Sequence, residues 1–96
     1  MGVDWLDISF RLEKSFNVKI ARSDTERLLA HAVIPGKTGV RCGDIHDMVV
    51  ELCVEQCRVV PKSSWTRVKL CIMHGCGAKA NKVRKDAWLV DDVGCC

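Results

Sequence analysis

Cysteine side chains offer the most versatile chemistry in this chain, because a thiolate can bind a metal ion, attack an electrophile or form a disulfide. Seven of the 96 residues are cysteines. They are Cys42, Cys53, Cys57, Cys71, Cys76, Cys95 and Cys96. Zinc sites often carry a CxxC pair, which the chain lacks. We therefore predict no metal site.

A buried cysteine packs as a small hydrophobic residue, and the sequence favours that role for most of these side chains. Cys53 and Cys57 lie four residues apart in a predicted helix, and Cys71 and Cys76 fall among apolar residues. A thiol- or zinc-binding module remains an alternative, with His74 as a further ligand.

Cys95 and Cys96 differ from the others, because they stand at the end of the sequence, where a thiol would be exposed. We predict a frayed tail there and keep both as candidate reactive thiols. The odd number of cysteines argues against a complete set of disulfides within one chain. With no visible secretory signal, we expect reduced thiols and a cytoplasmic location.

The remaining chemical groups give weaker signals. His31, His46 and His74 are scattered, and without a paired nucleophile and acid we predict no enzymatic activity. A basic run near the end has no aromatic residue inside it, so we expect a solvated loop and no nucleic-acid partner. Its residues are Lys79, Lys82, Arg84 and Lys85. No apolar run reaches the roughly 20 residues of a membrane span, so we expect no membrane contact.

The hydrophobic pattern predicts one all-α domain, a small bundle of three main helices with one or two short ones. The first main helix covers 4–16 and has an apolar face at helical spacing. That face consists of Trp5, Ile8, Leu12 and Phe16. A second apolar line follows another side, so this helix can pack on one side and offer the other to a partner. The second line consists of Val3, Leu6 and Phe10.

The next helices follow from caps and breaks in the pattern. A capping box of Ser23 and Glu26 predicts a short helix over 24–32. The glycines and proline of 34–43 predict a loop, after which the second main helix covers 44–57.

The third main helix is predicted over 65–74. We expect Ser63 or Ser64 to cap its start, and Gly75 and Gly77 to end it. Beyond this helix, two isolated apolar residues are expected to anchor a polar segment. They are Val83 and Leu89.

Three segments resemble parts of the acyl carrier proteins, in a different order from that family. The first helix of the family and the loop after it resemble WTRVKLCIMHGCGAKANKVRKDAWLVDDVG. The second helix resembles GVDWLDISFRLEKSFNVKI, and the start of the last helix resembles VRCGDIHDMVVEL. The resemblance implies a circularly permuted carrier-protein fold, formed by a monomer or by a segment-swapped dimer. Its parts would be 1–57 (helices two to four), 58–64 (a linker) and 65–96 (helix one and the loop after it).

In carrier proteins, a serine at the start of helix two carries a phosphopantetheine arm, whose thiol holds the acyl group. Aligned without gaps, Gly2 takes the position of that serine, and neither Ser9 nor Ser15 matches the motif. Because glycine has no hydroxyl group, the resemblance implies a domain with no arm and no cofactor. The alternative is a functional carrier of 4'-phosphopantetheine that is modified at an unexpected residue.

The resemblance also assigns a recognition surface to the first helix. The apolar partner contacts would be Val3, Leu6 and Phe10. The acidic rim around them would be Asp4, Asp7 and Glu13. Carrier proteins are strongly acidic, whereas this chain has a net charge of +3 and carries Arg11 and Lys14 on the same helix. Steering toward basic partners would therefore be weaker. We expect a non-catalytic interaction module whose first helix binds an unidentified protein.

Overall fold

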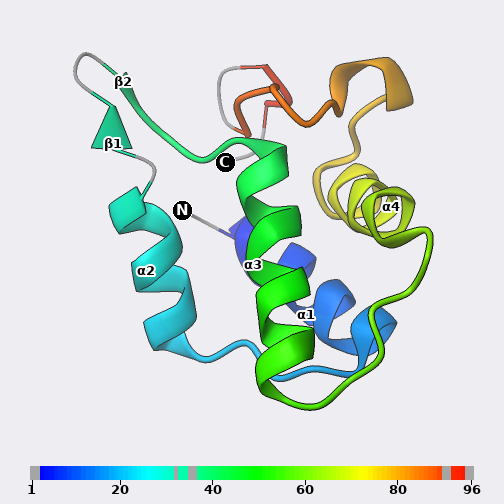
Figure 1. Cartoon of the computed structure of the whole chain (residues 1–96). Helices are drawn as coiled ribbons and strands as arrows, with labels where there is room; N and C mark the ends of the chain where they lie inside the picture. Colours follow the sequence, from blue (N-terminus) through cyan, green and yellow to red (C-terminus); the bar gives the residue numbers. More distant parts are fainter. Residues whose placement is uncertain (1–2, 32, 35–36, 90–91, 95–96) are drawn as a thin grey trace.

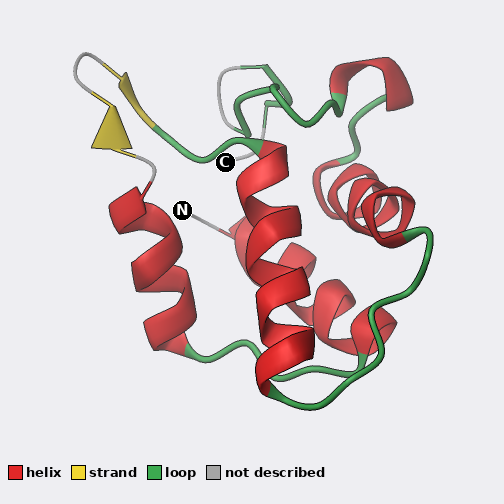
Figure 2. Ribbon diagram, in the orientation of Figure 1, coloured by secondary structure: helices red, strands yellow, loops and turns green. Residues whose placement is uncertain are grey.

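The computed structural model describes residues 3–31, 33–34, 37–89 and 92–94, and helices dominate that part of the chain (Figures 1 and 2). The helices are α1 (Val3–Phe16), α2 (Arg22–His31), α3 (Cys42–Glu55), α4 (Ser64–Cys76) and the short 3₁₀ helix η1 (Ala80–Lys82). Two short strands, β1 (Val33–Ile34) and β2 (Lys37–Thr38), pair antiparallel. The predicted small all-α bundle is confirmed, while the permuted order remains a prediction.

The helices pack around a shared apolar core. In Figure 1, α3 stands in the middle of the view, with α2 on one side and α4 on the other. α1 contacts both α3 and α4, and α3 also contacts α2. Burial of aliphatic side chains from α1, α3 and α4 provides the main driving force for this arrangement. The fully buried ones include Ile8, Leu12, Ile45, Val49, Val68 and Ile72.

The predicted inward face of α1 is confirmed. Trp5, Ile8, Leu12 and Phe16 are all buried, with at most 6% of any of them exposed. The indole N–H of Trp5 donates to Thr25 Oγ1 in α2 at 3.3 Å, which satisfies its polar group. One side of α1 is thus committed to the core.

α1 and α4 approach each other closely at Gly75. A Cβ atom added to Gly75 would lie 2.5 Å from Ile8 Cγ1, so a larger residue cannot fit without movement. The prediction that Gly75 ends the helix is wrong, because α4 continues to Cys76. Gly77 does end it, in the left-handed conformation with φ 66° that glycine adopts without strain.

The start of α2 corrects a predicted cap. α2 begins at Arg22, so Ser23 lies inside the helix. The carboxylate of Asp24 accepts the backbone N–H of Ala21 at 2.8 Å, while Glu26 pairs with Arg22 on the surface at 3.6 Å. Asp24 satisfies an unpaired backbone donor and places negative charge at the helix start, so it takes the role that the predicted capping box assigned to Glu26.

The start of α4 also differs from the prediction. Ser63 precedes the helix but makes no side-chain cap hydrogen bond. Ser64 Oγ instead hydrogen-bonds with His46 Nε2 of α3 at 2.8 Å. A tertiary contact therefore replaces the local cap and ties the start of α4 to α3.

The loop predicted over 34–43 is partly wrong, because β1 and β2 form a short hairpin there. Val33 lies opposite Thr38, and Ile34 opposite Lys37. Three of these four residues are β-branched, which suits an extended backbone. The hairpin is too short to add a sheet layer, so the fold remains helical.

The segment after η1 folds back onto the start of α3. The N–H of Leu89 donates to the carbonyl of Val40 at 2.7 Å, and the N–H of Gly43 to the carbonyl of Lys85 at 2.9 Å. Val83 and Leu89 are both at most 1% exposed, which confirms their prediction as apolar anchors.

Replacing Gly75 by alanine tests the close approach. Alanine in a helix interior normally stabilises by about 1 kcal/mol relative to glycine. Here we expect Gly75→Ala to lower the free energy of unfolding by about 1–3 kcal/mol, because the added methyl group must displace Ile8. Urea denaturation followed by circular dichroism measures this, with exposed Thr66→Ala as the control. A stabilised Gly75→Ala variant would contradict the helix spacing.

Candidate functional site

The outward side of α1 exposes large apolar side chains to solvent. Leu6 is 68% exposed and Phe10 55% exposed, one helical turn apart. These two of the three predicted apolar contacts therefore lie outside the core, on a helix whose other side is buried. The side chain of Val3, the third predicted contact, lies outside the described residues.

The predicted acidic rim is engaged in contacts within the chain. Asp7 forms an ion pair with Arg11 one turn on, at 3.2 Å. A carboxylate oxygen of Glu13 accepts the backbone N–H of Ile20 at 2.9 Å and so holds the loop after α1. Asp4 is half-buried. Asp7 and Glu13 are thus not free acidic contacts.

A groove of about 560 Å³ runs between α1 and α4, and we call it the basic groove. It is defined by Arg11, Lys14 and Ser15 of α1 and by Arg67, Leu70, Cys71 and His74 of α4. Lys14 also lies over the Phe10 ring, with its Nζ 4.6 Å from the ring centroid. The basic groove therefore adjoins the exposed apolar side of α1.

A second groove, of about 280 Å³, lies between α2 and α3 and is acidic. Its carboxylates come from Asp24, Asp44, Asp47 and Glu51. Asp24 holds Arg27 at 2.6 Å, and Asp44 accepts the N–H of Arg41 at 3.0 Å at the start of α3. Asp24 and Asp44 thus have structural roles. Among the described residues, no cluster of side chains suited to a metal ion occurs.

The free cysteines divide sharply by exposure. Cys42, Cys53 and Cys71 are buried, whereas Cys57, beyond the end of α3, is exposed. Burial, and then the nearby Asp92 carboxylate, raise the pKa of the Cys42 thiol to about 11. Burial also raises the pKa of Cys53 and Cys71. Because metal binding and nucleophilic attack need a thiolate, these three thiols suit packing instead.

Cys76 departs from the expectation of reduced thiols, because it is disulfide-bonded in this structure. It is also partly buried and packs against the core. Cys95 and Cys96, the candidate reactive thiols, lie outside the described residues. So does Gly2, the position matched to the attachment serine.

The two histidines with described side chains, His46 and His74, lie in different environments. His46 is half-buried, bonds to Ser64, and stands edge-on to the Trp65 ring at 5.9 Å between centroids. Burial, and then the nearby Lys85 cation, lower its pKa, so the neutral ring is the stable form at neutral pH. His74 is exposed and lines the basic groove.

The sequence reasoning missed the basic groove. The helix predicted over 65–74 was described only by its buried apolar face, which does not include Arg67, Leu70 and His74. Leu70, an apolar residue outside that face, could have indicated a surface contact site. The neighbouring helix could not be identified from the sequence, because it depends on the packing of α1 against α4.

Comparisons with protein-family models, with curated proteins and with solved structures find no match to this chain. None of the described helices is long and apolar enough to cross a membrane. The surface and chemistry of the described residues are therefore the basis for a functional proposal.

A pair of substitutions tests the two sides of α1. Leu12→Ala should lower the free energy of unfolding by about 2–5 kcal/mol, because it leaves a cavity in the core. Phe10→Ala should change it by less than about 0.5 kcal/mol, because that ring is largely exposed. Equal losses in chemical denaturation would contradict the division into two sides.

Alkylation tests the cysteine environments. With iodoacetamide at mildly alkaline pH, we expect Cys57 to react much faster than Cys42, Cys53 and Cys71, because their thiols are buried and their pKa values are raised. Mass spectrometry of proteolytic peptides follows each site, and denaturant should equalise the rates. Fast labelling of Cys42 in the native protein would contradict its position in the core.

Proposed function

We propose that the chain is a non-enzymatic protein-interaction domain that binds its partner through the outward side of α1. The observation that carries this proposal is the pair Leu6 and Phe10, largely exposed on a helix whose opposite side is buried. Exposed apolar clusters on a folded domain commonly mark interaction surfaces.

The energetics favour binding at this surface. Leu6 is 68% and Phe10 55% exposed, so burying what remains of each side chain in an interface would contribute about 1–2 kcal/mol. The core already orders α1 through Ile8 and Leu12, so little backbone entropy is lost when a partner docks. Aromatic residues such as Phe10 are also enriched at the centres of protein interfaces.

The carrier-protein resemblance extends the same proposal. The domain would be a circularly permuted carrier-like bundle without its own phosphopantetheine arm, acting as a monomer or a segment-swapped dimer in the cytoplasm. This reading requires a small helical bundle with an exposed apolar side on α1, and both features are present. The alternative, an arm attached at an unexpected residue, predicts a mass increase after treatment with a phosphopantetheinyl transferase.

Photo-crosslinking from position 10 tests the interaction directly. A benzophenone amino acid replaces Phe10 in the full chain, which is expressed in its native cells. The matched control carries the same amino acid at Val59, which is 88% exposed in the connection between α3 and α4. We expect a discrete adduct from position 10 alone.

Competition makes this result specific. An excess of unmodified chain should suppress the adduct, and an excess of a Leu6→Asp variant of equal stability should not. Adducts that form equally from positions 10 and 59, or that both competitors suppress equally, would contradict α1 as the docking surface.

A further inference from the structure

We propose that the basic groove holds an acidic amphipathic helix of the partner protein. This inference rests on the proposed function and adds to it the chemistry of the partner. The carrier-protein resemblance implied an acidic surface that meets basic partners. The groove beside that surface has the opposite charge.

The shape of the groove suits a third helix. Arg67, near the start of α4, contacts Ser15, near the end of α1, whereas Gly75 meets Ile8. α1 and α4 therefore run antiparallel, and the furrow between two such helices accepts another helix with its apolar side inward.

The floor of the groove supplies apolar contacts for that helix. Leu70 is 45% exposed beside the buried Cys71. Phe10 stands one turn from Lys14 along α1, so the exposed apolar side continues to the edge of the groove. A helix with an apolar stripe could contact both Leu70 and Phe10.

The rim of the groove supplies uncompensated positive charge. Arg11 is paired with Asp7, but among the described residues no ion pair engages Lys14 or Arg67. Arg67 donates one N–H to the Ser15 carbonyl at 3.2 Å, which leaves other guanidinium donors for a ligand. Glutamates flanking the apolar stripe of a partner helix would meet these cations.

Another anionic partner, nucleic acid, fits this groove less well. Single strands of nucleic acid bind through successive stacked aromatic rings, whereas Leu70 and Cys71 form this floor. An acidic helix matches the charge, the apolar floor and the shape together.

Selection from a displayed library of single helices tests the inference. The full chain serves as bait, and the surface residues of the library are random in charge. We expect the enriched helices to be amphipathic and net acidic. Synthetic versions are then titrated by fluorescence anisotropy against the chain and its variants.

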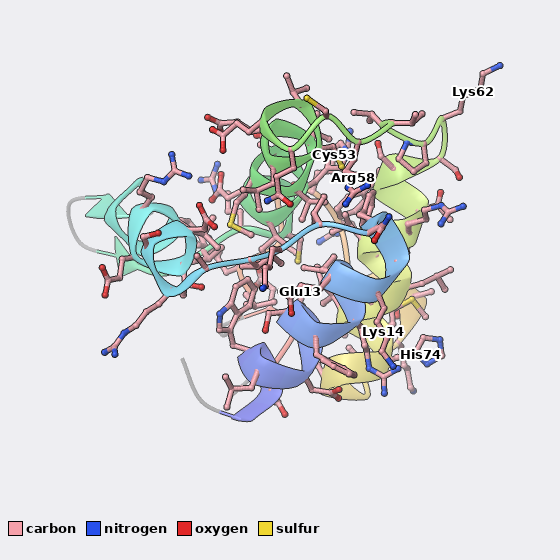
Figure 3. All side chains as sticks on the ribbon, turned by 90° about the horizontal axis from the view of Figure 1, so that it is seen from below. Glu13, Lys14, Cys53, Arg58, Lys62 and His74 are labelled. Atoms are coloured by element: carbon pink, nitrogen blue, oxygen red, sulfur yellow. The ribbon has the colours of Figure 1, made fainter. Side chains whose placement is uncertain are left out.

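Matched charge reversals locate the binding site. Lys14→Glu should weaken binding at least about tenfold, because it places like charges face to face. Lys62→Glu makes the same change on the connection before α4. In Figure 3, Lys62 projects outward at the upper right, away from Lys14 and His74, which lie close to each other lower in the view. We expect that variant to bind within about twofold of the unaltered chain.

Three results would overturn the inference. They are enrichment of basic or neutral helices, equal weakening by Lys14→Glu and Lys62→Glu, and selection of no helix by a chain that binds phosphatidylglycerol vesicles through Lys14. A cross-link from position 10 that persists unchanged in Lys14→Glu would also overturn it, while leaving the proposed function intact. Absence of that cross-link, with acidic helices still bound at Lys14, would instead contradict the proposed function alone.

Discussion

The contact between Ile8 of α1 and Gly75 of α4 is the constraint on which the rest of the structure depends. The helices meet where one of them has no side chain, so their backbones lie closer than two ordinary residues would allow. This approach buries Ile8 and Leu12 against Val68 and Ile72. It also fixes the rotation of α1, and therefore turns Leu6 and Phe10 outward.

The same contact brings the charges of the two helices together. α1 contributes Arg11 and Lys14, and α4 contributes Arg67, so a basic groove forms only when the helices pair. Some acidic side chains elsewhere accept backbone N–H groups: Asp24 at the start of α2, and Glu13 in the loop after α1. The electrostatic character of the surface is thus a product of tertiary packing more than of the net charge of the chain.

Much of the helical pattern could be predicted from the residues. The spacing of Trp5, Ile8 and Leu12 identifies both the helix and its buried side, since apolar periodicity is a strong local signal. Gly77 ends α4 as expected, because its left-handed backbone is a local requirement. The exposed side of α1 likewise followed from Leu6 and Phe10 lying off the buried face.

What escaped prediction depends on distant residues. Gly75 reads as a helix terminator in the sequence, and its packing role exists only because Ile8 lies against it. The sequence predicts Ser64 as a helix cap, but its hydroxyl group forms a hydrogen bond with His46 on another helix. The basic groove needs the pairing of α1 with α4, for which the sequence holds no local signal.

A double-mutant cycle between Ile8→Ala and Gly75→Ala tests the central contact most directly. Free energies of unfolding are measured by urea denaturation for the chain, both single variants and the double variant. If Ile8 is what excludes a Cβ atom at position 75, the loss from Gly75→Ala should shrink by more than about 1 kcal/mol once Ile8 is alanine. Additivity of the two losses within about 0.5 kcal/mol would show that the side chains do not meet, and would contradict the account.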